Sequence, residues 1–173
     1  QKFPNEPLLL FLSQMDLRLP DKNSATAMQF QLSKMISGGL YDPVNGGFFR
    51  YSTDRYWATP HFEKMLYNQA LLLQVYSAAF ISSGSALYRW LLLDLTDFIK
   101  RWLYQPAIGY ASAINADSDG QEGFYYRWPA ATLAQLPAAD IEEARLTTYP
   151  ASSQSALLGV ALQAPETAAA DRI

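Results

Sequence analysis

The stretch from Pro60 to about Ser82 constrains the fold more than any other, because it predicts a long helix that is apolar around half of its circumference. Thr59 is typical of a capping residue, and Pro60 then occupies the first helical position. Its apolar side chains recur at helical spacing: Phe62, Met65, Leu66, Leu72, Leu73, Tyr76 and Phe80. So wide an apolar face requires neighbours on more than one side, so we expect this helix to be largely buried.

Three more helices are predicted around it. One runs from Pro7 to Leu19, and the next begins with Ser24 as its cap and stops at Gly38. The fourth begins with Ser85 as its cap and ends near Tyr104. The polar side chains Glu63, Tyr67 and Gln74 are expected on the solvent side of the long helix, with Asn68 beside them, and Asp97 is expected to pair with Arg101 on the fourth helix.

Glycine-rich, aromatic segments separate the helices. A short extended segment is expected at 48–52, and two β-prone runs at 110–114 and 123–128 predict a hairpin. Short helices are predicted at 129–136, 138–146 and 155–162. The pattern is weak over 147–173. The chain is therefore expected to be one mainly α domain over 1–173, a partial (α/α)6 toroid of helical hairpins with short β-hairpin inserts.

The composition excludes several classes of function. The 173 residues contain no cysteine and one histidine, so we expect no zinc site and no cofactor held by thiolates, and we assign no metal or cofactor. The net charge of −3, with scattered basic residues, argues against nucleic acid. No apolar run is long enough for a membrane span, and we expect a cytoplasmic protein that is a piece of a longer chain.

Candidate acid–base groups gather near the expected start of the long helix. His61 and Glu63 are of the types that transfer protons, and Lys64 and Tyr67 follow them closely. A purely structural interpretation stands beside this one, in which the helix dipole favours Glu63 and His61 is packed. Lys64 argues mildly against it, because a cation near a helix N-terminus has the unfavourable sign.

Asp117 and Asp119 lie in a polar turn that matches the first half of a calcium-binding loop. The position that would supply the bidentate glutamate is Tyr126, so a hairpin turn is the favoured interpretation. The two carboxylates are also suited to a sugar-binding cleft, and paired carboxylates suit glycoside hydrolysis.

Several motifs occur together in the order found in one family. The chain resembles the thioredoxin-domain proteins related to spermatogenesis-associated protein 20 and their bacterial YyaL-type counterparts. The resemblance extends from Lys2 to about Leu136 and rests on these motifs: Lys2-Phe3-Pro4, Gly38-Gly39-Leu40-Tyr41-Asp42, Gly46-Gly47-Phe48-Phe49-Arg50-Tyr51-Ser52, Pro60-His61-Phe62-Glu63-Lys64-Met65-Leu66-Tyr67, Ala116-Asp117-Ser118-Asp119-Gly120 and Glu122-Gly123-Phe124-Tyr125.

The resemblance implies a fold and a general class of ligand. In that family a thioredoxin-like domain precedes an (α/α)6 toroid similar to six-hairpin glycosidases and to the N-acylglucosamine 2-epimerase group, and the activity is undefined. This chain resembles the opening part of the toroid. It departs from the family pattern at one histidine position, Phe49, and at three acidic positions, Asn68, Ile114 and Asn115.

Two hypotheses follow. The first is a carbohydrate-processing or carbohydrate-binding domain, with isomerase-like, epimerase-like or glycosidase-like chemistry if it is an enzyme. Its acid–base candidates are His61, Glu63 and Asp117. Its substrate-binding candidates are Arg50, Tyr51, Trp57, Lys64, Tyr67 and Asp119. The second is a diverged, non-catalytic scaffold that packs against a thioredoxin-like domain. Because a partial ring leaves an apolar edge, we also expect self-association or a longer chain.

Overall fold

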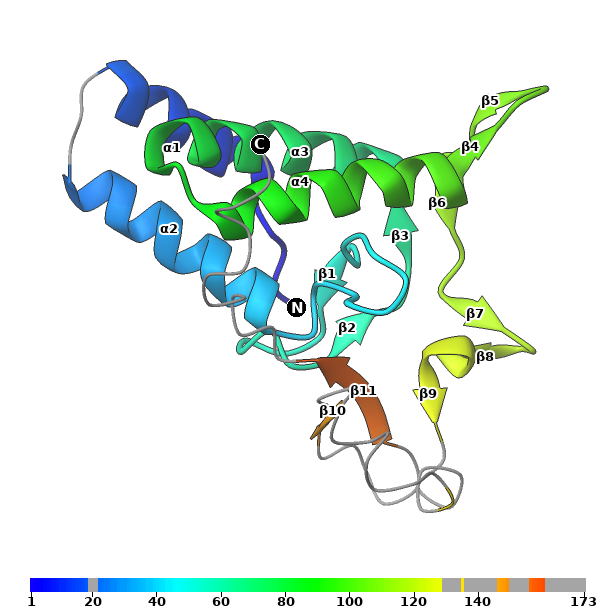
Figure 1. The fold of residues 1–173 in the computed structure, drawn as a ribbon. Helices are drawn as coiled ribbons and strands as arrows, with labels where there is room; N and C mark the ends of the chain where they lie inside the picture. The colour runs from blue at the N-terminus through cyan, green and yellow to red at the C-terminus, as the bar shows by residue number, and fades with distance from the viewer. Residues whose placement is uncertain (19–21, 129–134, 136–145, 150–155, 161–173) are drawn as a thin grey trace.

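The computed structural model describes residues 1–18, 22–128, 135, 146–149 and 156–160. Four α-helices dominate these residues (Figure 1). Their bounds are Glu6–Arg18 (α1), Lys22–Ser37 (α2), Leu66–Ser83 (α3) and Ala86–Phe98 (α4), and the π-helical turn η1 (Ile99–Leu103) continues α4. The chain is therefore mainly α, as predicted.

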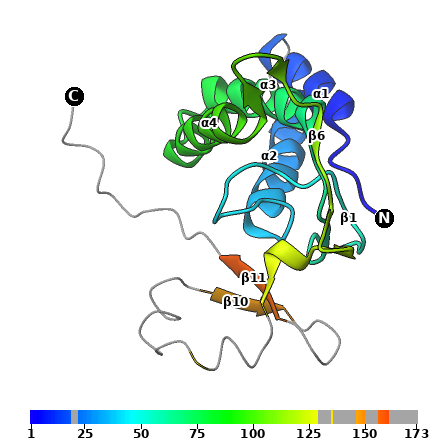
Figure 2. The ribbon, with the colours of Figure 1, turned by 90° about the vertical axis from the view of Figure 1, so that its right-hand side faces the viewer.

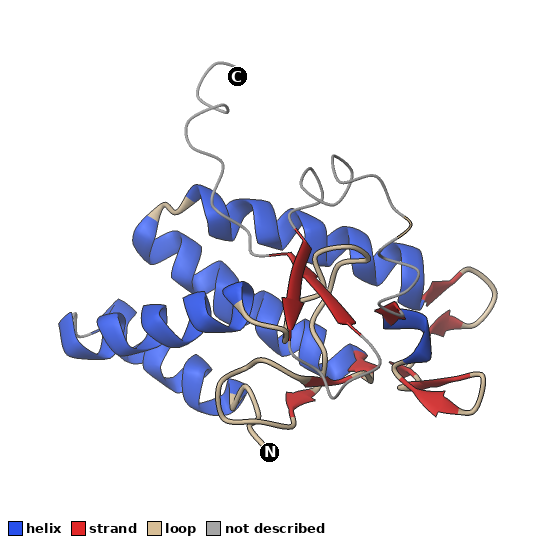
Figure 3. Cartoon of the chain, turned by 90° about the horizontal axis from the view of Figure 1, so that it is seen from below, coloured by secondary structure: helices blue, strands red, loops and turns tan. Residues whose placement is uncertain are grey.

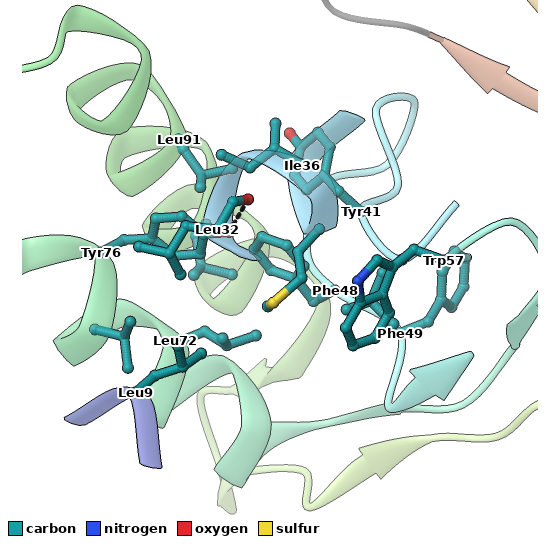
Figure 4. Close-up of a cluster of buried hydrophobic side chains, with 14 of the residues drawn as sticks. Leu9, Leu32, Ile36, Tyr41, Phe48, Phe49, Trp57, Leu72, Tyr76 and Leu91 are labelled. Carbon is teal, nitrogen blue, oxygen red and sulfur yellow. Dashed lines mark hydrogen bonds between the residues drawn. The ribbon is translucent and has the colours of Figure 1, made fainter. Parts of the chain in front are cut away.

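The helices form two antiparallel hairpins, and α3 lies between α1 and α4. α1 packs on α2 within the first hairpin and on α3 of the second, so the two hairpins share one interior (Figure 2). The helical faces meet in a continuous apolar core, in which Leu32, Leu72, Tyr76 and Leu91 are completely buried (Figure 4). The Tyr76 hydroxyl donates a hydrogen bond to the Leu32 carbonyl at 3.1 Å, so even this buried polar atom is satisfied.

Short antiparallel strands lie between α2 and α3 and after η1 (Figure 3). They pair as β1 with β2, β3 with β6, β4 with β5, β7 with β8, and β10–β11–β9. Their bounds, with those of the 3-10 turn η2, are Tyr51–Ser52 (β1), Pro60–His61 (β2), Lys64–Met65 (β3), Tyr104–Gln105 (β4), Gly109–Tyr110 (β5), Ala113–Ile114 (β6), Asp117–Ser118 (β7), Gln121–Glu122 (β8), Phe124–Tyr126 (η2), Arg127–Trp128 (β9), Leu146–Tyr149 (β10) and Ala156–Val160 (β11).

The predicted start of the long helix is wrong. α3 begins at Leu66, and the preceding segment is extended, because Pro60–His61 pairs with β1 and Lys64–Met65 pairs with β6. Thr59 is not a cap, since its carbonyl accepts hydrogen bonds from the Thr53 backbone and hydroxyl. The candidate residues at 61–64 therefore lie on strands and in a turn rather than on the first turn of a helix.

The solvent side predicted for α3 is also partly wrong. Asn68, which was expected beside that side, is buried, and its neighbour Gln69 is buried as well. The Gln69 side chain accepts a hydrogen bond from the Phe48 N–H at 2.9 Å and donates one to the Phe48 carbonyl at 2.7 Å, in the manner of a neighbouring strand. Asn68 Nδ2 donates to Glu6 Oε1 at 2.5 Å and so ties α3 to α1. These buried amides attach the loops and α1 to the central helix.

Other boundaries differ in smaller ways. Ser24 lies inside α2, and Ser85 precedes α4 without a side-chain capping bond. The predicted stop after α3 is confirmed, since Gly84 adopts the left-handed conformation at φ 66°. The predicted Asp97–Arg101 pair is confirmed as well, at 2.6 Å.

The predicted hairpin at 110–114 and 123–128 is replaced by three smaller pairings, because 113–114 pairs with β3 instead. The helix predicted at 155–162 is wrong over 156–160, which forms β11. The helices predicted at 129–136 and 138–146 lie almost entirely outside the described residues, and Leu146 is in β10.

Asp54 organises the loop between β1 and β2. Its carboxylate accepts hydrogen bonds from the backbone N–H groups of Tyr56 and Thr59, each at 2.6 Å, and from that of Ala58 at 3.2 Å. Partial burial raises the pKa of Asp54, but the backbone hydrogen bonds outweigh it, so the pKa lies below its ordinary value.

We expect Asp54→Asn to lower the free energy of unfolding near neutral pH by about 1–2 kcal/mol, because a neutral amide oxygen is the weaker acceptor. A depressed folded-state pKa means that the contribution is present above the unfolded-state pKa and is lost as the pH falls through the folded-state value. Urea unfolding from pH 7 to pH 3 should therefore show the difference between wild type and variant shrinking with acid. A difference that stays constant over this range would contradict the assignment.

Candidate functional site

Four ionisable side chains meet beside β1 and β2, and we call them the polar cluster: Arg50, His61, Glu63 and Glu122. Arg50 Nη1 donates to Glu63 Oε2 at 2.9 Å. His61 Nδ1 lies 2.6 Å from Glu122 Oε1, and its Nε2 lies 3.9 Å from Glu63 Oε2. The His61 ring also stacks on Tyr51, with the ring centroids 4.7 Å apart. His61 thus links β2 to the hairpin formed by β7 and β8.

Arg50 is held as a cation within this cluster. Its hydrogen bonds with Glu63 and with Tyr67 raise the pKa of the Arg50 guanidinium above its ordinary value. Tyr67 is half-exposed on the first turn of α3 and so lies beside the cluster. The structure therefore brings together five of the predicted site residues: Arg50, Tyr51, His61, Glu63 and Tyr67.

Lys64 lies elsewhere, in the interior. The side chain is 0% exposed on β3, and its Nζ is 2.6 Å from Asp42 Oδ2 and 2.7 Å from the Gly46 carbonyl. Burial lowers the pKa of Lys64, and the Asp42 carboxylate opposes that shift. Three rings surround the ammonium, with centroids at 4.8, 4.8 and 5.3 Å: Phe49, Phe98 and Tyr126.

The loop that holds Asp42 is built around this ion pair. Asp42 Oδ1 accepts hydrogen bonds from the backbone N–H groups of Val44 and Asn45. Gly47 has φ 78°, and a Cβ there would lie 2.6 Å from a ring carbon of Phe98, so a side chain does not fit. The glycine thus lets the loop approach α4 closely and close over Lys64.

Trp57 is not available to a ligand in this structure. The side chain is 2% exposed and belongs to the apolar core (Figure 4). The backbone carbonyl of Trp57 accepts the Gly39 N–H at 2.6 Å, so the loop folds back onto the end of α2. Trp57 was expected to contact ligand, but its ring is packed in the apolar core instead of lining a cleft.

A cavity of about 250 Å³, which we call the loop cavity, opens where α4 and η1 end. Its walls come from the loop before β1, from α4 and η1, from β6 and β7, and from η2. The residues that line it are Asn45, Lys64, Phe98, Trp102, Ile114, Asn115, Asp117, Ser118, Tyr125 and Tyr126. Aromatic rings, amides, a hydroxyl and a carboxylate thus face one space, which suits a small ligand with both apolar faces and hydroxyl groups.

The two aspartates of the polar turn are separated by the hairpin. Asp117, on β7, faces the loop cavity, whereas Asp119 occupies the exposed turn between β7 and β8 with φ 50°. The nine predicted site residues therefore fall into the polar cluster, the loop cavity, the hairpin turn and the core, and they do not form one constellation.

No local pattern in the sequence indicates several of the cavity residues. The one sequence feature that points to them is their position within or beside the motifs that carry the family resemblance, as for Asn45, Asn115 and Tyr125. The pairing of β3 with β6 brings Lys64 to the same cavity as Asn115, but these residues are far apart in the chain and no local pattern predicts the contact.

Within the described residues, no group of three or more histidine, cysteine, aspartate or glutamate side chains is arranged to hold a metal ion. Among those same residues, no helix has the length and apolar character needed to cross a bilayer.

The helical hairpins and short β-hairpins define an α/α-toroid class of fold, of the (α/α)6 type. The structure superposes on a sugar epimerase from a ruminal bacterium with a TM-score of 0.57 at 19% identity, over 64% of this chain and 28% of that one. The cellobiose 2-epimerase of Spirochaeta thermophila gives a TM-score of 0.57 at 22% identity, over 66% and 29%. A D-mannose isomerase gives 0.57 at 15% identity, over 65% and 29%. At such identities the likeness establishes the fold alone.

The sequence places the chain more closely. It is 43% identical to human spermatogenesis-associated protein 20 and 42% identical to the mouse protein, over 145 residues in each case. No protein-family model matches the chain. The matched part is 78% of this chain, and the chain spans only 18% of the length of these relatives. The chain is therefore a relative of spermatogenesis-associated protein 20, and the resemblance inferred from its motifs is confirmed.

Proposed function

We propose that the chain is part of a carbohydrate-binding or carbohydrate-processing domain, and that the loop cavity holds the sugar. The observation that carries the proposal is the lining of this cavity, where Trp102, Tyr125 and Tyr126 supply rings and Asn45 and Asn115 supply amides. A sugar ring has apolar C–H faces and a rim of hydroxyl groups, which match such a lining. The sugar epimerases and the isomerase on which this structure superposes have the same fold, and this lends general support to a carbohydrate ligand.

Within this proposal Asp117 is the charged residue at the ligand, and the buried Lys64 lies behind the cavity wall. The Asp117 carboxylate is exposed in the cavity wall and is suited to accept a hydroxyl hydrogen bond or, in an isomerase-like reaction, a proton from carbon. Lys64 Nζ donates to Asp42 and to the Gly46 carbonyl, so the buried ion pair would hold the loop that brings Asn45 to the cavity.

The polar cluster has a different part in the proposal. His61 holds Glu122 on β8, and β8 pairs with β7, which carries Asp117. His61 and Glu63 would therefore position the hairpin that bears Asp117, with Arg50 fixing Glu63 in turn. In this role they act through Asp117 rather than on the sugar itself.

The proposal is tested by titrating the 173-residue chain with glucose, mannose, N-acetylglucosamine and cellobiose by calorimetry. We expect at least one to bind, and we expect Asp117→Asn to weaken that binding by about tenfold, the effect of losing one hydrogen bond to a charged group. Asp119→Asn is the matched control, because it changes the same charge on the same hairpin outside the cavity. Equal affinities for the two variants would remove the cavity from the proposal.

A specific observation favours the alternative of a diverged, non-catalytic scaffold. Two of the positions that depart from the family pattern, Ile114 and Asn115, line the loop cavity. A third, Phe49, packs edge-on against Tyr126, with the ring centroids 5.1 Å apart. If these exchanges removed the chemistry, none of the sugars would bind in the same titration. The exposed apolar side chains Phe11 and Phe30 would then serve a thioredoxin-like domain or a second copy, which sedimentation would detect.

A further inference from the structure

The hairpin formed by β4 and β5 extends away from the helices, beyond the end of α4 (Figure 1). We call residues 102–110 the aromatic hairpin. The segment contains no charged side chain, and four of its large apolar side chains are exposed, by 42 to 83%: Trp102, Tyr104, Ile108 and Tyr110. A projecting segment with several exposed apolar side chains and no charge is a candidate binding surface.

The backbone arranges the rings of this hairpin on the outside. Leu103 is completely buried, so its neighbours Trp102 and Tyr104 point away from the core. Tyr104 lies directly opposite Tyr110 in the strand pair, and their ring centroids are 5.0 Å apart. The Ala111 N–H donates to the Leu103 carbonyl at 2.8 Å and anchors the base of the hairpin.

The hairpin is continuous with the loop cavity. Trp102 belongs to both, because the π-helical turn η1 directs it into the cavity wall four residues after Phe98. A π-helical turn is rare and is often found at functional sites. A ligand that fills the cavity and extends past Trp102 would therefore meet the pair formed by Tyr104 and Tyr110 next.

The chemistry of the exposed rings indicates which kind of ligand could extend from the cavity onto the hairpin. A charged polymer would need opposite charges, and residues 102–110 offer none. Two tyrosines with flat rings and hydroxyl groups offer stacking surface and hydrogen bonds together. Neutral sugar units joined in a chain need both.

We propose that the aromatic hairpin binds the further units of an oligosaccharide whose terminal unit occupies the loop cavity. This inference rests on the proposed function and adds the substrate class, a neutral oligosaccharide rather than a single sugar. Tyr104 and Tyr110 determine the preference for chain length, and Trp102 lies between the two binding regions.

The test compares glucose with cellobiose and cellotetraose, and mannose with mannotetraose, by calorimetry on the 173-residue chain. For the wild type the tetrasaccharide of one series should bind about three- to tenfold more tightly than its monosaccharide, the gain that aromatic contacts provide. The double variant Tyr104→Ala/Tyr110→Ala should lose this gain and keep the affinity for the monosaccharide. Tyr56→Ala, which removes a ring that is 76% exposed on another loop, is the control and should keep the gain.

The outcomes separate the two proposals. If a monosaccharide binds but affinity does not increase with chain length, the proposal for the aromatic hairpin is overturned. The same holds if the increase in affinity persists in the double variant. In both cases the proposal for the loop cavity is retained. If a tetrasaccharide binds through both tyrosines and no monosaccharide binds, the aromatic hairpin is supported as a sugar-binding surface and the loop cavity is rejected as a sugar site. If no sugar binds, both proposals fail. If Ile108→Ser converts a self-associated chain into a monomer in sedimentation, the hairpin is a protein contact and the inference is overturned.

Discussion

Replacing Lys64 with methionine is expected to lower the free energy of unfolding by about 3–5 kcal/mol, because it leaves the Asp42 carboxylate buried without its counter-charge. The Lys64 side chain is 0% exposed and that of Asp42 is 6% exposed, so water cannot replace the lost partner. A domain of this size is stable by only about 5–15 kcal/mol, so the loss is a large fraction of the total. Urea unfolding monitored by circular dichroism measures it.

Two further variants show whether burial is the cause. Arg101→Met breaks the Arg101–Asp97 pair, which also has a 2.6 Å contact but is more than half exposed, and it should cost only about 0–1 kcal/mol. The double variant Lys64→Met/Asp42→Asn should recover part of the loss, because an uncharged amide at position 42 still accepts the N–H groups of Val44 and Asn45. If Lys64→Met costs no more than Arg101→Met, the buried pair does not stabilise the fold.

The helices could be predicted because their signals are local. Apolar side chains at helical spacing identified the body of each helix, and the predicted end of the long helix near Ser82 lies one residue from the observed end of α3 at Ser83. The start of α3 could not be predicted in the same way. Thr59 and Pro60 satisfy the local rules for a helix start, but pairing of Pro60–His61 with β1 and of Lys64–Met65 with β6 overrides them. The competing interactions come from distant parts of the chain.

The same physics limited the prediction of the site. His61, Glu63 and Lys64 are close in sequence and were expected near one another on a helix. On an extended backbone successive side chains point to opposite sides, so Glu63 turns to Arg50 at the surface while Lys64 turns inward to Asp42. When this extended segment is interpreted as a helix, Glu63 and Lys64 are therefore predicted to be neighbours, although one lies at the surface and the other in the interior.

Replacing Trp57 with alanine is expected to lower the free energy of unfolding by about 3–5 kcal/mol, the usual cost of deleting a large buried ring. Trp57 is 2% exposed and lies among the core side chains of α2 and the first loops. The Lys2 ammonium lies 4.3 Å from the centroid of the ring, so the indole also holds the N-terminal segment in place. Differential scanning calorimetry should show a clearly lower melting temperature.

The magnitude of this loss separates a core residue from a ligand contact. A ring exposed in a cleft would cost little stability when removed, as expected for Tyr56→Ala one residue earlier, where the side chain is 76% exposed and the change should stay within about 0.5 kcal/mol. Trp57→Phe should restore most of the stability, because a smaller ring keeps much of the packing. A Trp57→Ala variant that melts like Tyr56→Ala but loses sugar binding would return Trp57 to the ligand site and show that the loop between β1 and β2 does not pack in solution as it does in this structure.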